Sequence, residues 1–405
     1  MNTKNLLGIQ PELRDYIDSL GVGLPPIRGT WFVVDPYGAT YPAVGDQPGQ
    51  IVADLETAYG LCTSGFGDGI LVLSGGTGTA SQTSSYLSHP LVWSKHGITV
   101  VGACAPTKFA QRARISNVTH TTGSISVLAF VAGSGSTYDK ITRTTGSFIT
   151  NGFEVGDYIR INTTGNGADA TGLIISAVEA LTLTLTTIGT LVTETAANAG
   201  ASVVSSYCTD LISVTGSNNS FYNLHITHTG ADALELTALK VSGSRNYFSN
   251  VHAGVGVADA NTTITHSLWL SAAAENTFEG CVFGLDTVDR GGVATYDIYL
   301  SGAVARNRFY DCETVRHSST GTGCLAVYAD TTTGGRPTLF KNCIFTIWNT
   351  AGGNANCSYM GGSTGACDFI WLVNCDYPGY AALSNDSVFW ISGEVNSQAS
   401  GLMYT

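Results

Sequence analysis

The chain has 405 residues and a formal net charge of −12, and only 12% of its residues are charged. This acidic balance, with no run rich in lysine and arginine, argues against a nucleic-acid partner, because phosphate binding requires concentrated positive charge. No apolar run is long enough to span a bilayer, so we expect no membrane partner. The 49 glycines, with abundant serine, threonine and asparagine, favour strands and turns over long helices.

Residues 1–28 are predicted to form an N-terminal docking arm with a short amphipathic helix. Pro11 lies near the first turn and Gly21 ends the helix. A helix this short is marginally stable alone, so its apolar face must pack on the chain's own fold or on another subunit. The predicted docking residues on this face are Leu13, Tyr16, Ile17 and Leu20. The basic start and apolar stretch of a signal peptide are missing, so we do not expect secretion by the ordinary route.

Residues 29–111 are predicted to begin a β-solenoid and to provide a helix that covers its open end. Strands are expected at 70–73 and 98–102. A cover is needed because an exposed terminal coil would template pairing with other chains. We expect the covering helix to start at Pro48, and its apolar residues at helical spacing are Ile51, Leu55, Ala58, Tyr59 and Cys62.

Residues 112–204 are predicted to form a small antiparallel β-domain inserted into the solenoid. The alternation of leucine and threonine over 181–185 is typical of a half-buried strand. Asn151 and Gly152 form a dipeptide that favours a tight turn between strands.

Residues 205–405 are predicted to form the main coils and a C-terminal cap, because one four-residue motif recurs there every 27 to 32 residues. The motif starts with an aromatic or aliphatic residue, has Asn, Asp or Gly at its third position and ends with a small apolar residue or cysteine. Asn, Asp and Gly tolerate the left-handed backbone region, so we expect a bend at the third position. The copies begin at Phe221, Phe248, Phe278, Phe309, Phe340 and Leu372.

Equivalent residues of the copies are expected to stack in columns. The fourth position gives an interior column that contains Cys281, Cys312, Cys343 and Cys375, which we expect to be reduced thiols, hence folding in a reducing cytoplasm. The redox state of Cys324, Cys357 and Cys367 stays open. An asparagine two residues before each phenylalanine is expected to form an amide ladder, and its members are Asn219, Asn246, Asn276 and Asn307. A third strand per coil is marked by Val214, Val241, Leu270, Leu300, Val327 and Met360. The predicted fold is therefore all-β: a right-handed parallel β-helix with three strands per coil, short N-terminal helices and the inserted domain.

Two segments resemble known families. The order of elements in residues 30–104 and the coils from 205 onward resembles pectate-lyase-like β-helix proteins. The run from Thr145-Gly146-Ser147-Phe148 to Leu181-Thr182-Leu183 resembles a β-module of tailed-bacteriophage virion proteins. The first resemblance implies the fold and leaves the chemistry open.

The second resemblance implies a bacteriophage virion structural protein, made and assembled in the host bacterial cytoplasm. We expect a capsid decoration or cement protein on the head surface, a homotrimer whose arm binds the major capsid protein or other virion proteins by adhesion. The alternative is a tailspike or fibre that binds, and in one version cleaves, host surface polysaccharide. A third interpretation is a cellular polysaccharide-active enzyme of pectate-lyase type.

No catalytic residue, cofactor or metal site is predicted, because no carboxylate pair lies in a specific motif. The residues expected to contact carbohydrate, if any does, are Asp232, Glu235, Tyr296, Asp297 and Trp348, which combine carboxylates with rings that can stack on sugars. His225 and His252 both follow a repeat phenylalanine by four residues. We expect them side by side on neighbouring coils as an exposed surface pair.

Overall fold

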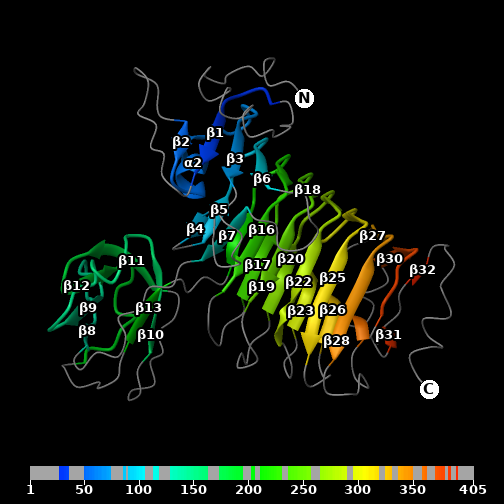
Figure 1. Cartoon of the computed structure of the whole chain (residues 1–405). Coiled ribbons are helices and arrows are strands. Elements are labelled where there is room, and N and C mark those ends of the chain that lie inside the picture. Colours follow the sequence, from blue (N-terminus) through cyan, green and yellow to red (C-terminus); the bar gives the residue numbers. More distant parts are fainter. Residues whose placement is uncertain are drawn as a thin grey trace. The chain divides into compact units, whose positions relative to one another are not determined.

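A computed structural model shows a parallel β-solenoid and one small antiparallel sheet (Figure 1). The chain divides into a solenoid unit, Met1–Tyr86, Leu91–Ser116 and Asp210–Thr405, and an insert unit, Leu87–Pro90 and Asn117–Thr209. The structure describes residues 27–35, 50–73, 85–87, 90–104, 113–117, 128–162, 173–194, 202–205, 210–229, 236–256, 265–289, 295–318, 324–330, 336–349, 358–362, 370–378, 382–384 and 389–390. The predicted docking residues Leu13, Tyr16, Ile17 and Leu20 lie outside these ranges.

Three parallel sheets form the solenoid, and we name them A, B and C. Sheet A contains, in spatial order, β2 (Ile51–Val52), β1 (Trp31–Val34), β3 (Gly69–Leu73), β6 (Thr99–Ala103), β15 (Ser220–Tyr222), β18 (Tyr247–Ser249), β21 (Thr277–Glu279), β24 (Arg308–Tyr310), β27 (Thr338–Lys341), β30 (Ile370–Val373) and β32 (Phe389–Trp390). Sheet B contains β28 (Ile344–Asn349), β25 (Glu313–Ser318), β22 (Val282–Asp289), β19 (His252–Val255), β16 (His225–His228), β7 (Arg114–Asn117) and β4 (Ser85–Leu87). Sheet C contains β31 (Ala382–Ser384), β29 (Ser358–Gly362), β26 (Cys324–Asp330), β23 (Thr295–Ser301), β20 (Thr265–Ser271), β17 (Leu236–Val241), β14 (Asp210–Val214) and β5 (Leu91–Trp93).

Each full coil takes one strand from sheet C, then A, then B, which confirms the predicted parallel solenoid with three strands per coil. The motif phenylalanines are buried and stack from coil to coil, with ring centroids 4.4 to 4.9 Å apart and planes within 8° of parallel. The predicted bend at the third motif position is also confirmed, because all six residues there have φ between 51° and 60°. Consecutive coils therefore lie in register, and the strands follow the repeat.

The predicted amide ladder is confirmed. The side-chain Nδ2 of each of the first three asparagines donates to Oδ1 of the asparagine on the next coil at 3.1 Å. The backbone N–H of the same residue donates to that Oδ1 at 2.9 to 3.0 Å. The four side chains are at most 1% exposed, so the ladder satisfies polar groups that water does not reach. It ends at Asn307, because Thr338 takes the equivalent position on the next coil.

The cysteine column is confirmed as free thiols: Cys281, Cys312 and Cys343 are buried and Cys375 is half-buried. Of Cys324, Cys357 and Cys367 the structure describes no side chain. The predicted third-strand column is partly wrong, because Leu300 pairs with Ala329 and Val327 pairs with Ile298 and Met360. An offset of two residues keeps every side chain on the same face of the strand, so the sequence alternation does not reveal it.

The helix near the open end is shorter than predicted. Ile51 belongs to strand β2, and helix α2 covers Leu55–Leu61. Asp54 is the N-cap and accepts a hydrogen bond from the Thr57 N–H at 2.7 Å, which explains why the helix starts there and not at Pro48. Leu55, Ala58 and Tyr59 are buried. Within the described residues this is the one helix, and it is too short to cross a membrane.

The insert unit contains a six-stranded antiparallel sheet, as predicted. Its strands, in spatial order, are β13 (Ser202–Ser205), β10 (Tyr158–Asn162), β11 (Leu173–Val178), β12 (Thr182–Leu185), β9 (Lys140–Arg143) and β8 (Leu128–Val131). Its core includes Phe148, Ile159 and Leu183, which are fully buried. The carboxylate of Asp139 accepts hydrogen bonds from the backbone of Gly133 and of Gly189 and Thr190, so one buried acid ties two loops together.

Candidate functional site

The sequence-predicted carbohydrate contacts do not form one cluster in the structure. Asp232 and Glu235 lie outside the described residues. Trp348, on β28 of sheet B, is 64% exposed. Tyr296 and Asp297 are neighbours on β23 of sheet C, but their side chains have different surroundings.

Asp297 is fully buried and forms an ion pair inside the solenoid. Its carboxylate accepts from Arg316 of β25 at 2.9 and 3.2 Å, and Arg316 also donates to the hydroxyl and carbonyl of Thr295. Both charged side chains are 0% exposed. A carboxylate in this position does not reach a glycan at the outer surface, so Asp297 is a structural residue. This ion pair cannot be predicted from the local sequence, because the partner of Asp297 belongs to a strand of another sheet.

Tyr296 belongs to a group of five rings on sheet C, which we call the aromatic face. Tyr296 stacks on Tyr328 of the next coil, with centroids 4.3 Å apart and 7° between planes. Trp269, Tyr299 and Tyr328 pair directly across β20, β23 and β26, and their centroids are 5.5 and 5.8 Å apart. The five members are His266, Trp269, Tyr296, Tyr299 and Tyr328.

Exposure separates the aromatic face into two rows. Trp269, Tyr299 and Tyr328 are half-buried, whereas His266 is fully buried and Tyr296 is 6% exposed. Burial, with the nearby Tyr328 and Asp330, raises the pKa of Tyr296 to about 12, so this phenol stays protonated at neutral pH. The buried His266 and Tyr296 stack on Tyr299 and Tyr328 of the outer row, whose three rings are partly open to solvent.

Polar groups border the outer row. Lys240 precedes Trp269 in the same register, and its Nζ lies 3.8 Å from the centre of the indole ring. This ammonium also pairs with Asp210 at 2.9 Å. The Trp269 Nε1–H donates to the Ser301 hydroxyl at 2.7 Å, and the Tyr299 hydroxyl donates to exposed Asp330 at 3.1 Å. Apolar ring faces beside charged groups and hydroxyls suit the binding of a sugar, which has both kinds of surface.

The sequence contains a signal for two rings of the outer row. Trp269 and Tyr299 each stand immediately before a residue of the predicted third-strand column, Leu270 and Leu300. Because successive side chains of a strand point to opposite faces, the residue before an inward one points outward. Reading that position along the repeat would have found these two rings.

A second surface is a pocket of about 610 Å³ on sheet A, which we call the arginine pocket. Thr277, Arg308, Leu339 and Trp371 pair in direct register on β21, β24, β27 and β30 and form one row of it. The remaining residues come from the segments before these strands. The complete lining is Glu275, Thr277, Arg306, Asn307, Arg308, Arg336, Pro337, Leu339 and Trp371.

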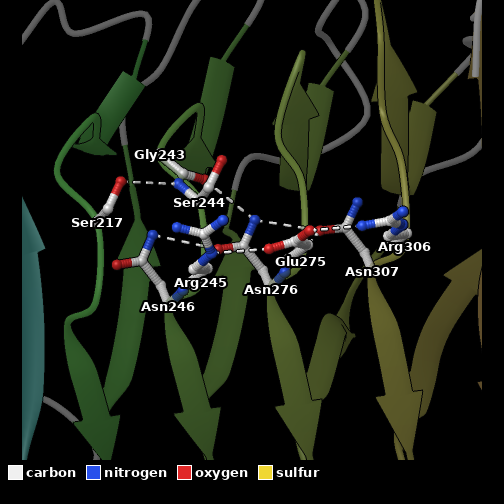
Figure 2. A network of polar contacts seen from close by, with 9 residues as sticks. All are labelled: Ser217, Gly243, Ser244, Arg245, Asn246, Glu275, Asn276, Arg306 and Asn307. Carbon is white, nitrogen blue, oxygen red and sulfur yellow. Dashed lines mark hydrogen bonds and ion pairs between the residues drawn. The ribbon is translucent and has the colours of Figure 1, made fainter.

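The chain makes a second bend at the residue before each ladder asparagine, and on three consecutive coils this residue is charged, as Figure 2 shows. Glu275 accepts from Arg245 at 2.7 Å and from Arg306 at 2.9 Å, so one carboxylate bridges three consecutive coils. Hydrogen bonds from both guanidinium groups lower the pKa of Glu275. All three residues have φ near +60°, a region that arginine and glutamate rarely adopt.

The two histidines lie on neighbouring coils, as predicted, with stacked rings 4.4 Å apart. The prediction that they form an exposed pair is wrong, because His225 is 2% and His252 is 3% exposed. The Nε–H of Arg114 donates to Nδ1 of His225, and Nε2 of His252 bonds to the carbonyl of Gly284. Burial lowers the pKa of His225 well below its usual value and that of His252 to about 4, so both rings are neutral. No group of three potential metal ligands occurs among the described side chains.

No protein-family model matches the chain, and no curated protein sequence matches it. Among solved structures, the pectin methylesterase from Aspergillus niger in deglycosylated form aligns over 94% of this chain and 95% of that chain, with 10% identity and a TM-score of 0.43. The pectin methylesterase PemA from Erwinia chrysanthemi aligns over 92% and 97%, with 12% identity and a TM-score of 0.39. The Pseudomonas phage phi297 tailspike gp61 aligns over 80% and 72%, with 11% identity and a TM-score of 0.19. At these identities and scores, the likenesses carry no conclusion about activity.

Proposed function

We propose that this protein is a virion component of the tailspike or fibre kind, and that it binds a polysaccharide of the bacterial surface through the aromatic face. The observation that carries the binding role is the row of half-exposed rings, Trp269, Tyr299 and Tyr328, on three consecutive coils. A ring on each coil offers a glycan chain several stacking positions in sequence. Lys240 and Asp330 at the ends of this row provide hydrogen bonds to sugar hydroxyls.

The proposal is binding without cleavage. Glycoside hydrolysis needs two carboxyl groups within about 10 Å of each other. Among the residues that the structure describes, the carboxylates that border the aromatic face are Asp210 and Asp330, on β14 and β26, which are four strand spacings apart in sheet C. Four spacings of roughly 4.8 Å separate these strands by about 19 Å, which is too far for the reaction. Asp297, the carboxylate nearest to Tyr296 in sequence, is held by Arg316.

The test is a binding measurement on purified full-length protein with capsular and lipopolysaccharide glycans from bacteria. Trp269→Ala and Tyr299→Ala should each weaken binding about tenfold, which corresponds to about 1.4 kcal/mol. Trp348→Ala is the comparison, because this exposed ring lies on sheet B. If Trp348→Ala weakens binding and the two sheet C variants do not, the aromatic face is not the site.

The role of a capsid decoration protein stays a prediction, as do the homotrimer and the docking arm. Removing residues 1–28 tests them together: a folded trimer that no longer joins particles is expected if the arm binds the capsid. If the shortened chain still occupies particles fully, the docking arm is refuted. An enzyme version of the tailspike role predicts new reducing ends when host polysaccharide is incubated with the protein.

A further inference from the structure

The arginine pocket concentrates positive charge in an acidic chain. Three of the 18 lysines and arginines, Arg306, Arg308 and Arg336, line it, although the net charge of the chain is −12. Glu275 is the one acidic residue of the lining, and it is shared with Arg245 outside the pocket. Ion pairs between exposed side chains add little to stability, so stability alone is a weak reason for this arrangement.

Two of the pocket arginines have no carboxylate partner among the described residues. Arg308 donates to the hydroxyl of Tyr310 at 3.0 Å, and Arg336 has no hydrogen bond or ion pair within the described part of the chain. Both side chains are exposed. A guanidinium group presents a planar set of donors that matches a carboxylate, and such charge-assisted bonds are stronger than neutral ones. The pocket therefore offers two cations for which the described residues supply no carboxylate partner.

The backbone fixes the third arginine at the rim. Arg306 has φ of 58°, and the equivalent residue of an earlier coil is Asn218, with φ of 60°. Asparagine tolerates this region better than arginine does, so an arginine here costs conformational energy that an asparagine would save. The amide ladder at the next residue, Asn307, holds the bend in place (Figure 2). Arg306 is thus a charged side chain on a strained but rigid support.

The rest of the lining suits a sugar ring. Leu339 and Trp371 follow Arg308 on the next two strands of sheet A in direct register, and both are half-buried. Pro337 adds a third apolar surface. An indole and a leucine beside arginines pair an apolar face with an anion site, and a sugar acid has the same two features. A free inorganic anion would use the arginines and leave the apolar residues without a role.

We propose that the arginine pocket binds a sugar unit that carries a carboxylate, with Arg308 and Arg336 on the carboxylate and Trp371 against the ring. This inference rests on the proposed function for the idea that the sugar belongs to a polysaccharide. The pocket and the aromatic face belong to different sheets, so each can be tested by itself. The pocket would then bind glycans that carry a carboxylate more tightly than neutral glycans.

The experiment compares two probes of equal length, a β-1,4-linked oligoglucuronate and the matching cello-oligosaccharide, which differ in a carboxylate at each ring. Wild-type protein should bind the charged probe at least tenfold more tightly, and added salt should weaken that binding. Arg308→Gln and Arg336→Gln should each remove about tenfold of the preference. Lys341→Gln is the matched control, because it removes one exposed positive charge from the same sheet outside the pocket.

Equal affinity for the two probes, or an equal loss in Lys341→Gln, overturns the proposal. Competition by inorganic sulfate at the same concentration as the oligoglucuronate overturns the sugar part of it. If Trp269→Ala abolishes binding while the arginine variants keep the full charge preference, the pocket fails and the proposed function stands. The reverse result, in which the arginine variants lose binding and Trp269→Ala keeps it, supports the pocket and removes the aromatic face.

Discussion

The solenoid and the insert differ in how their buried side chains contact each other. In the solenoid, equivalent residues of successive coils meet each other, as in the phenylalanine stack and the amide ladder. In the insert, each contact occurs once, and a single carboxylate, Asp139, accepts from several loop N–H groups. A repeated contact adds up along the solenoid, so its stability is a sum over neighbouring coils. A contact in the insert, such as those of Asp139, contributes only once.

The ion pair of Arg316 and Asp297 is a unique contact inside the repeating unit. Leu285 and Ile347 occupy the position of Arg316 on the two neighbouring coils, and both are apolar. One coil therefore contains two buried charges, whereas the two neighbouring coils have apolar side chains at the position of Arg316. This exception gives the largest effect that we expect from a single substitution.

Arg316→Leu should destabilise the solenoid by about 3–5 kcal/mol, because it leaves the charge of Asp297 buried without a partner. The double variant Asp297→Ala, Arg316→Leu removes both charges, and its free energy of unfolding should lie within about 1 kcal/mol of the wild-type value. Urea unfolding followed by tryptophan fluorescence measures this, since all six tryptophans lie outside the insert. Equal losses in the single and double variants would contradict the role assigned to the pair.

Asn276→Ala should cost about 2–3 kcal/mol, because it interrupts the ladder at two junctions and leaves buried donors of Asn246 without an acceptor. The matched change in the insert is Asp139→Ala, which removes one acceptor from several donors. Asn276→Ala should lower the fluorescence transition, whereas Asp139→Ala should lower the hydrogen-exchange protection of β9 and β12 and leave that transition unchanged. A common shift of both readouts in either variant would show that the two units unfold together.

These differences also explain what the sequence predicted. The bends at Asn223 and Asn250, the phenylalanine stack and the ladder follow from a repeat that places like residues at like positions. The partner of Arg316 lies on another sheet, and His252 is buried against residues of neighbouring coils such as Gly284; no local period encodes either contact. The arginine pocket was not predicted although one row of its residues stands directly before the first motif position, because the residue type at that position changes from coil to coil. The aromatic row was within reach, because it follows the strand alternation.

Acid should weaken the two units in different pH ranges. The pKa of His252 is lowered from 6.5 to about 4, mainly by burial, with the Gly284 carbonyl and Asp286 opposing that shift. The unfolded chain takes up a proton near pH 6.5 and the folded chain does not, so solenoid stability is lost as the pH falls from 6.5 towards 4. The loss at pH 5 is on the order of 2 kcal/mol for His252, and His225, whose pKa is lowered by burial, His252 and Arg114, adds to it.

The insert should respond only at lower pH. Burial alone would raise the pKa of Asp139, but the hydrogen bonds from Gly133, Thr187, Thr190 and Gly189 outweigh it and lower that pKa below its usual value of 3.8. Its contribution is present above the unfolded pKa and is lost as the pH falls below about 4. Unfolding at pH 7, 5 and 3.5, with fluorescence for the solenoid and hydrogen exchange for the insert, separates the two. In the double variant His225→Gln, His252→Gln, the free energy of unfolding of the solenoid should change much less between pH 7 and pH 5 than in the wild type. A pH dependence equal to that of the wild type would contradict the assignment.

The smallest effects on stability are expected at exposed apolar side chains, which take part in neither the repeated nor the unique buried contacts. Trp348 on the solenoid is 64% exposed and Val192 on the insert is 63% exposed. Each change to alanine should alter the free energy of unfolding by less than about 0.5 kcal/mol, because little surface is removed from water at either site. A loss above about 1 kcal/mol in Trp348→Ala would mean that this ring is covered in the assembled protein. Repeating the measurement at several protein concentrations, beside a mass determination, then shows whether the cover is a second copy in the predicted homotrimer, since a contact between copies makes the apparent stability depend on concentration.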